Sequence, residues 1–359
     1  MLTYIGIERL QELLASVGTG RFIEELAGEI EADYRRWEDF EKSSRHASHS
    51  AAGVIELMPA SDGRLYAFKY VNGHPCNTAA GLLTVTAFGV LADVATGYPL
   101  LLSELTFTTA LRTAAMSALA ARWMARPDST CMALIGNGAQ AEFQALAFHR
   151  MLGIRELRLF DVDPRATSKV ERNLAAMRLP DLQVVRCASS AEAVRGADIV
   201  TTATADKRNA VILTPDMIEP GMHLNAVGGD CPGKTELHAD ILRRPDVRIV
   251  VEFEPQSRVE GEIQQLDHAT AVSEFAAVVA GRVPGRAHAD EVTLFDSVGF
   301  ALEDFSALRY LMRLHEQRRA GARELDLIPE LTDPKDLFGA LKPARAPRAA
   351  TLVAERASS

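Results

Sequence analysis

Apolar residues recur every three or four positions along Arg21–Lys42, with charged residues between them. This period predicts an amphipathic helix. Shorter apolar runs follow the helix and predict strands at residues 54–58, 66–71, 82–94 and 98–103. The Ala-Thr-Gly between the last two runs is typical of a hairpin turn. The first 105 residues therefore predict a helix combined with antiparallel strands, before an Ala-rich helical segment at residues 109–126.

From Cys131 onward, apolar strands alternate with helical segments. The predicted strands are residues 131–135, 157–160, 182–185, 198–202, 222–227, 247–251 and 292–295. Strands separated by helices require right-handed crossovers and a parallel sheet. A helical stretch at residues 300–318 follows the last strand, and the Pro/Ala/Arg-rich tail from Lys342 predicts a flexible end. The pattern as a whole predicts an α/β protein.

Composition narrows the class of protein further. A chain of 359 residues is long enough for about two domains. With 39 Lys and Arg against 48 Asp and Glu, the net charge is −9, so we expect neither a nucleic-acid partner nor an anionic membrane surface. Four widely spaced cysteines without a CxxC pair favour a reducing, cytoplasmic location and indicate no zinc knuckle. The start lacks a signal-peptide pattern.

The strongest local motif is a glycine-rich turn directly after the strand at residues 131–135. Gly136 permits a tight turn, Gly138 lets the backbone approach a pyrophosphate, and Ala141 lets the following helix pack closely. Asp161 ends the next strand, 20 residues after Ala141, where an acidic side chain binds ribose hydroxyls. The motif predicts a Rossmann domain that binds NAD; the alternative is a glycine turn in a sheet that binds no nucleotide.

The choice between NAD and NADP depends on charge near the ribose. The Asp161 carboxylate would repel a 2′-phosphate, which favours NAD. Arg165 and Lys169 follow closely and would favour NADP, but they fall on the next helix. NAD is therefore the predicted cofactor.

Three ionisable residues interrupt apolar segments. Glu56 and Lys69 lie in predicted strands, and Arg112 lies in the Ala-rich helix. Buried charges must be paired or bind a ligand, so each is either a salt-bridge partner or part of a binding site. His46 and His49 form an HxxH pair without a third ligand, and we interpret them as ordinary polar residues, with no metal site.

The segment 225–237, NAVGGDCPGKTEL, combines glycines with charge where a Rossmann strand ends. Ligands of α/β sheets bind at that edge. Asp230 can there take a proton from a bound amine beside a nicotinamide. The alternatives are a tight turn in which Asp230 is a capping residue, and a nucleophilic role for Cys231, for which the sequence places no histidine partner.

These residues carry a resemblance to a known family. The chain resembles the ornithine cyclodeaminase/mu-crystallin family, and within it the bacterial cyclodeaminase branch, over roughly residues 45–304. The runs that carry the likeness include RHASHS, VIELMP, FKYVNGHP, TALRTAA, ALIGNGAQAEFQALAFH, VGGDCPGKTEL, VEFEPQ, EGEIQQL and FDSVGFALED.

The resemblance implies two domains and a homodimer. Residues 1–114 and 317–359 would form an α/β domain, built from the N-terminal segment and the C-terminal helix, that binds substrate and dimerises through its strands. Residues 115–316 would form the Rossmann domain that binds NAD.

The resemblance also implies roles for individual residues. Arg45, Lys69 and Arg112 would hold the substrate carboxylate, because converging cations form a sound carboxylate clamp. Asp230 would be the proton donor and acceptor, and Val298 would contact substrate through its backbone. We add Glu56 as a residue that orients water or an amine. Besides Gly136 and Gly138, the implied cofactor contacts are Thr84, Arg112, Ala139, Gln140, Asp161, Thr204, Val227, Gly228, Gly229, Asp230, Lys234 and Ser297.

The implied activity is conversion of L-ornithine to L-proline and ammonia, an ammonia-lyase reaction in which NAD takes up and returns one hydride. The alternatives are a net amino-acid dehydrogenase, a ketimine reductase, a lysine cyclodeaminase and a non-catalytic small-molecule binder of the mu-crystallin type. The sequence does not show the pocket for the distal amine, so the substrate's chain length stays open.

Overall fold

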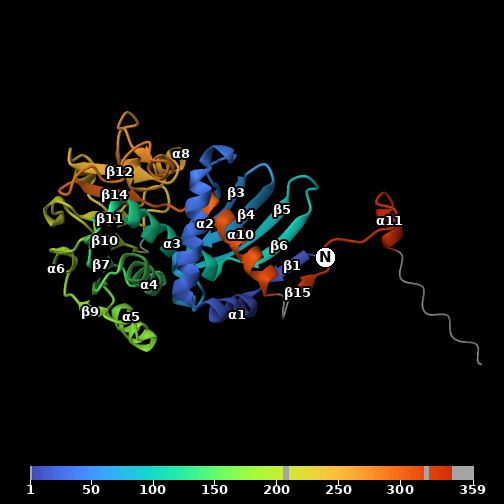
Figure 1. Cartoon of the computed structure of the whole chain (residues 1–359), viewed down its shortest axis with the longest axis horizontal. Coiled ribbons are helices and arrows are strands. Elements are labelled where there is room, and N and C mark those ends of the chain that lie inside the picture. Colours follow the sequence, from blue (N-terminus) through green and yellow to red (C-terminus); the bar gives the residue numbers. More distant parts are fainter. Residues whose placement is uncertain (1, 205–209, 319–322, 342–359) are drawn as a thin grey trace, which may run out of the picture.

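The computed structural model describes residues 2–204, 210–318 and 323–341, and its strands form two sheets with helices between and around them (Figure 1). One sheet has seven strands in the order β15-β1-β6-β5-β4-β3-β2. The other has eight strands in the order β13-β12-β14-β11-β10-β7-β8-β9. The α/β class and the parallel Rossmann sheet are confirmed.

The seven-stranded sheet is built mainly from the N-terminal segment. Its strands are β1 (Leu2–Ile5), β2 (His46–His49), β3 (Val54–Ser61), β4 (Leu65–Gly73), β5 (Val85–Asp93), β6 (Pro99–Glu104) and β15 (Arg323–Leu325). The predicted strands β3 to β6 pair antiparallel in chain order. Along β3, Met58 is buried whereas Ile55 and Leu57 are exposed. One face of this sheet is therefore covered and the other open.

The eight-stranded sheet is parallel at every pairing. Its strands are β7 (Cys131–Ile135), β8 (Glu156–Phe160), β9 (Gln183–Arg186), β10 (Ile199–Thr202), β11 (His223–Ala226), β12 (Val247–Val251), β13 (Ser273–Glu274) and β14 (Val292–Asp296). The chain runs outward from β7 through β8 to β9, then returns to β10 on the other side of β7. The switch point between β7 and β10 is where such sheets bind ligands.

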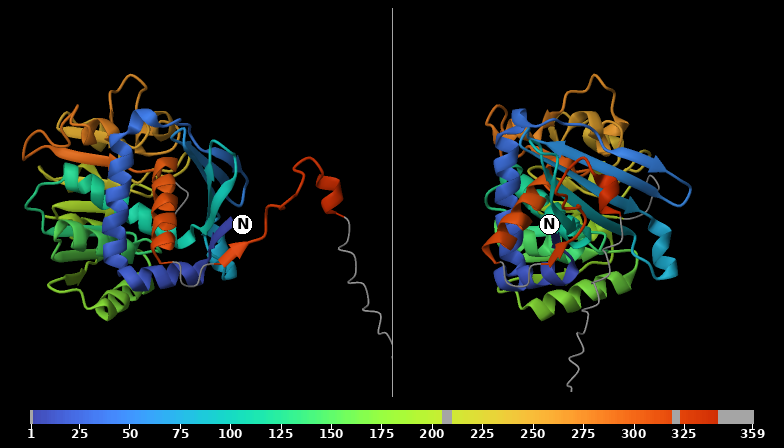
Figure 2. Two further views of the ribbon diagram at one scale, coloured as in Figure 1. Left: turned by 45° about the vertical axis from the view of Figure 1, so that its right-hand side comes forward. Right: turned by 90° about the vertical axis from the view of Figure 1, so that its right-hand side faces the viewer.

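Helices α2 (Thr19–Arg35) and α10 (Ala301–Gln317) lie side by side between the two sheets (Figures 1 and 2). Helix α10 packs on β3, β4 and β5, so the C-terminal part of the chain returns to the first sheet. The other helices are α1 (Ile7–Val17), α3 (Thr106–Met124), α4 (Ala141–Leu152), α5 (Pro164–Met177), α6 (Ser190–Val194), α7 (Ala239–Leu242), α8 (Glu254–Ser257), α9 (Phe275–Val279) and α11 (Leu337–Ala340), with 3-10 turns η1 (Trp37–Asp39), η2 (Pro75–Ala80), η3 (Pro215–Met217) and η4 (Glu262–Gln265).

Some boundaries differ from those that the sequence predicts. The helix expected to reach Lys42 ends at Arg35. The apolar period continues beyond it because Trp37, in the 3-10 turn, and Phe40, directly after the turn, are also buried. The strand expected from residue 82 begins at Val85, after the η2 turn. Helix α3 runs across the predicted domain boundary at residue 114.

Two further features concern the surface and the tail. Helix α11 lies away from the body of the molecule (Figure 2). The tail predicted to be flexible from Lys342 lies outside the described residues. Within the described ranges, no helix is long and apolar enough to cross a membrane.

Candidate active site

The glycine-rich turn lies at the switch point of the parallel sheet. Gly136 has φ +92°, and a Cβ there would lie 2.6 Å from the carbonyl oxygen of Ala203, which follows β10. Only glycine fits this close approach. Gly138 has open space where a Cβ would project, and α4 begins three residues later. The turn therefore leaves free the space in front of a helix N-terminus, where a pyrophosphate binds.

Asp161 lies beside this turn, directly after β8. Its carboxylate accepts hydrogen bonds from the backbone N–H groups of Asn137 at 2.6 Å and of Asp163 at 2.8 Å. A carboxylate has about four acceptor positions, so it can still accept bonds from ribose hydroxyls. The Oε1 atom of Gln140 is buried without a hydrogen-bond partner within the described ranges, beside the turn. These groups fit a dinucleotide.

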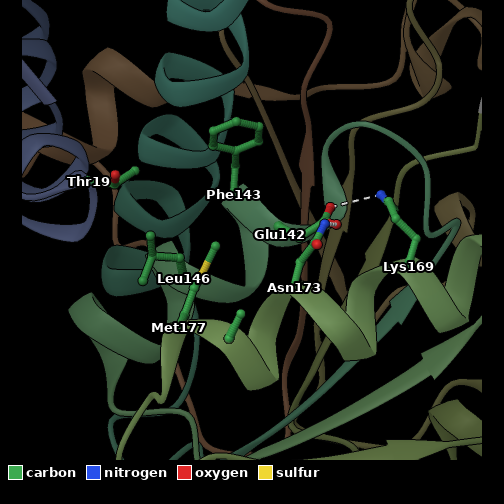
Figure 3. Close-up of a pocket in the computed structure, with 8 residues that line it drawn as sticks. Thr19, Glu142, Phe143, Leu146, Lys169, Asn173 and Met177 are labelled. Carbon is green, nitrogen blue, oxygen red and sulfur yellow. Dashed lines mark hydrogen bonds and ion pairs between the residues drawn. The ribbon is translucent and has the colours of Figure 1, made fainter. Parts of the chain in front are cut away.

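The two cations that could favour a 2′-phosphate already have partners. Arg165 pairs with Asp163 at 3.0 Å. Lys169 donates to the Gly138 carbonyl at 2.7 Å and to Glu142 at 2.9 Å. Figure 3 shows the Lys169–Glu142 pair at the edge of a cavity of about 550 Å³ between α4 and α5. Lys169 therefore fixes α5 to the glycine-rich turn.

The buried cations Lys69 and Arg112 meet on one carboxylate. Lys69 Nζ lies 2.7 Å from Asp304 Oδ2, and Arg112 Nε lies 3.1 Å from Asp304 Oδ1. Arg112 also pairs with Glu303 at 2.7 Å. Burial lowers the pKa of Lys69 to about 8, with Arg112 adding to this effect and Asp304 opposing it. Arg112 lies against Gly299, whose Cβ would be 2.7 Å from Nη1.

Arg45 connects the first sheet to the loop after β14. Its Nη2 donates to the carbonyl oxygens of Val298 at 2.6 Å and Gly299 at 2.7 Å. Its Nη1 lies 3.1 Å from Glu56, and its Nε lies 3.2 Å from Glu260. The structure thus brings Arg45, Glu56 and Val298 together, as a substrate site requires. Each of the three predicted cations has an acidic partner in this state.

Asp230 lies in the loop after β11, opposite Lys234. The Lys234 Nζ atom lies 3.2 Å from Asp230 Oδ1 and donates to the Thr204 carbonyl at 3.0 Å. The Asp230 side chain is 57% exposed, whereas that of Lys234 is 5% exposed. Burial lowers the pKa of Arg45, and the charges of Glu260, Glu56 and Asp230 outweigh it and raise that pKa. Asp230 therefore acts electrostatically on the Arg45 cluster while its own carboxylate stays accessible.

Four buried carboxylates hold the loops around this site, and sequence reasoning missed them as functional residues. Glu236 accepts from the N–H groups of Thr204 at 2.7 Å and Gly228 at 2.8 Å. Glu252 accepts from Ser297 Oγ at 2.7 Å and from the N–H of Val298 at 2.8 Å. The other two are Glu262, which binds the N–H groups of Glu236 and Leu237, and Asp296, which binds those of Glu262 and Ile263.

The sequence did contain a signal for these carboxylates. Glu252 directly follows the apolar run of β12, and Asp296 is the last residue of β14. An acid at the carboxyl end of a buried parallel strand lies beside the loops that bind ligands. Among the other predicted residues, Thr84 lies before β5, where its carbonyl accepts from the N–H of His74 at 2.8 Å. His46 and His49 lie exposed on β2.

The chain combines a doubly wound parallel sheet, a glycine turn, an acid after the second strand and a cluster of buried cations. These features define a dinucleotide-binding α/β protein of the dehydrogenase type. Its family follows from comparison with known proteins. A model of the ornithine cyclodeaminase/mu-crystallin family matches residues 8–318, and the chain belongs to that family.

Relatives and solved structures agree with this membership. The chain is 58% identical over 341 residues to the ornithine cyclodeaminase of Agrobacterium fabrum, which covers 95% of each chain. It is similar to an archaeal alanine dehydrogenase dimer with bound NAD, with a TM-score of 0.80, 28% identity and coverage of 90% and 99%. It is also similar to the Thermococcus litoralis Δ1-pyrroline-2-carboxylate reductase in complex with NADH and L-proline, with a TM-score of 0.82, 27% identity and coverage of 90% and 100%.

Proposed function

We propose that this chain is an NAD-dependent ornithine cyclodeaminase that converts L-ornithine to L-proline and ammonia. The observation that carries the proposal is 58% identity over 95% of the chain to a protein of that name. The site supports it, because the charge of the accessible Asp230 acts on the buried Arg45, and Lys234 joins the Asp230 loop to Thr204 after β10.

The cations would hold the substrate by exchanging partners. Arg45, Lys69 and Arg112 each contact an acidic side chain, and a substrate carboxylate can replace such a partner with equivalent charge-assisted hydrogen bonds. Val298 would contact substrate through its backbone. Such a clamp fixes the α-carbon, and orientation of this kind can supply about 7 kcal/mol of the barrier.

Two carboxylates would serve the amino groups. The Asp230 carboxylate is accessible, and among the described residues its ion pair is with Lys234. It can therefore accept a proton from the α-amine and return it. Glu56 is 6% exposed beside Arg45 and would orient an amine or water.

The cofactor would bind across the switch point. Gly136, Gly138, Ala139 and Gln140 would face the pyrophosphate, and Asp161 would bind the ribose. When bound, NAD supplies a hydride acceptor that returns the hydride later in the cycle. The remaining predicted contacts line the same edge of the sheet: Thr204, Val227, Gly228, Gly229, Asp230, Lys234 and Ser297, with Arg112 and Thr84 from the first 114 residues.

A homodimer would form through the open face of the seven-stranded sheet. Exposed apolar residues gather there on β3, β4 and β5, namely Ile55, Leu57, Tyr66 and Phe88. An exposed apolar patch of this kind marks an interaction surface. In the proposed division into residues 1–114 with 317–359 and residues 115–316, the first unit would carry the dimer surface and the second the dinucleotide turn, and both would contribute residues to the site. A cytoplasmic location completes the proposal.

Incubation of the purified protein with L-ornithine and trace NAD tests the activity. We expect proline and ammonia to form in equal amounts, far beyond the NAD present, without accumulating NADH. Stoichiometric NADH would instead indicate a net dehydrogenase, and pipecolate from lysine at a higher rate would indicate a lysine cyclodeaminase. Saturable binding of an amino acid without any product would indicate a binder.

A further inference from the structure

Glu260 is a buried carboxylate to which the roles above assign nothing. It lies between α8 and η4 and is 5% exposed. Its Oε2 lies 3.2 Å from Arg45 Nε, yet within the described residues that oxygen has no hydrogen-bond partner. Glu252, Glu262 and Asp296 are also buried, and all three accept hydrogen bonds from backbone N–H groups. Glu260 therefore does not hold a loop as they do.

An unsatisfied buried acceptor costs about 1–3 kcal/mol, and more when it is charged. Burial raises the pKa of Glu260 to about 7; Arg45 opposes this effect, and the charges of Glu56 and Asp230 add to it. Within the described residues, the charges that act on Glu260 come from the segment before β2, from β3 and from the loop after β11. A group kept in this costly state indicates a binding or catalytic site.

The charges around Arg45 are unbalanced. One guanidinium faces both Glu56 and Glu260, and the charge of Asp230 acts on it as well. If Arg45 turns to a substrate carboxylate, Glu56 and Glu260 lose their cation. A second positive charge on the same ligand would replace it. A diamino acid supplies this charge at its far end.

We propose that Glu260, together with Glu56, binds the distal ammonium of the substrate and takes one proton from it, which makes Glu260 a specificity-determining residue for diamino acids. The inference rests on the proposed function. One N–H bond of the ammonium breaks, an O–H bond forms on Glu260, and the nitrogen lone pair is free to attack the substrate's α-carbon. The attack takes place once the proposed hydride removal has made the α-carbon an imine carbon. A bond forms from the distal nitrogen to that carbon, the bond to the original α-nitrogen breaks, and the proton held by Glu260 completes that nitrogen, which leaves as ammonia.

A carboxyl that titrates near neutral pH suits this exchange. A general base works best when its pKa lies near the working pH, because it must both accept and release the proton. Asp230, in the loop after β11, remains available for the α-amine. The two proton transfers would therefore use two separate carboxylates.

The variant Glu260→Gln tests the proposal, with L-norvaline as a ligand of equal length that lacks the distal amine. We expect kcat/KM for ornithine to fall at least 30-fold, while the inhibition constant of norvaline stays within twofold. Glu254→Gln is the matched control, since Glu254 lies on the same segment and pairs with Arg258 away from the cluster. Unchanged ornithine kinetics, or equal weakening of both ligands, would overturn the proposal.

Two further measurements separate this inference from the proposed function. The acid limb of kcat/KM against pH should lie near 7 in the wild type and disappear in Glu260→Gln. If the wild type makes no proline, the proposed function fails, but calorimetric affinities of the NAD-loaded protein still decide the inference. Glu260→Gln should then lose the preference for ornithine over norvaline, and Glu260→Asp should keep part of it. An unchanged preference would contradict the role of Glu260.

Discussion

The buried carboxylates in two regions of this protein differ in the groups that they bind. At the carboxyl ends of the parallel strands, Glu236, Glu262 and Asp296 accept backbone N–H groups. In the cluster between the two sheets, Glu56 and Asp304 pair with the side chains of cations. Backbone donors stay in place when a ligand enters, whereas side-chain partners can exchange for it. Carboxylates of the first region therefore hold the loops, and those of the second can exchange with a substrate.

The largest expected effect tests Asp230, an exposed carboxylate that belongs to neither region. Asp230→Asn removes the proposed proton acceptor, and acid–base groups of this kind contribute about 10²–10⁴-fold. We expect ornithine turnover to fall about 10³-fold in steady-state assays. The free energy of unfolding should change by less than about 1 kcal/mol, because the side chain is 57% exposed. Near-wild-type turnover would remove Asp230 from the chemistry.

The second prediction concerns the stability of the fold instead of the activity. In Glu236→Gln, an NH₂ group would replace an oxygen that accepts the N–H groups of Thr204 or Gly228. Because a buried donor would then face a donor, we expect a loss of about 3 kcal/mol in urea unfolding. Glu254→Gln should cost less than about 1 kcal/mol, because the Glu254 side chain is 39% exposed beside Arg258. Equal losses would show that Glu236 does not hold the loops.

The sequence predicts local features of the fold better than it predicts partners in the site. The glycine turn at Gly136 and the alternating strands are local patterns, and the structure has them where expected. The four-residue strand β1 shows no such pattern, and β15, its antiparallel partner, comes from the other end of the chain. Arg112 was predictable as a buried charge, but its partner Asp304 lies 192 residues away. A single sequence carries no signal for such a pairing.

The third prediction concerns how the stability of the fold depends on pH through Asp296, a carboxylate of the first region. Burial raises the pKa of Asp296 to about 7 against an ordinary value of 3.8, with Glu236 adding to this effect and the N–H groups of Glu262 and Ile263 opposing it. The folded protein therefore binds more protons than the unfolded chain between about pH 4 and 7, and its stability falls as pH rises through that window. We expect the free energy of unfolding to be about 2 kcal/mol higher at pH 5.5 than at pH 8.

The control for this prediction is Asp296→Asn, which cannot titrate. Its absolute stability should be lower at every pH, because an amide accepts only through its oxygen. Its slope of stability against pH between 5.5 and 8 should be shallower than that of the wild type. An identical slope would mean that other groups cause the pH dependence, and Glu260, with its pKa near 7, would be the next to replace.

The smallest expected effect concerns a charge outside both regions. Arg165 is 91% exposed and pairs with Asp163 at the ribose end of the dinucleotide turn. Exposed pairs contribute about 0–1 kcal/mol, so Arg165→Ala should change the dissociation constant of NAD by less than threefold in titration calorimetry. NADP should bind at least tenfold more weakly than NAD to both proteins, because Asp161 and Asp163 repel a 2′-phosphate whether or not Arg165 is present. A selective loss of NADP affinity in the variant would show instead that Arg165 leaves Asp163 to bind the phosphate, and that even a solvent-exposed pair in this protein can exchange its partner for a ligand.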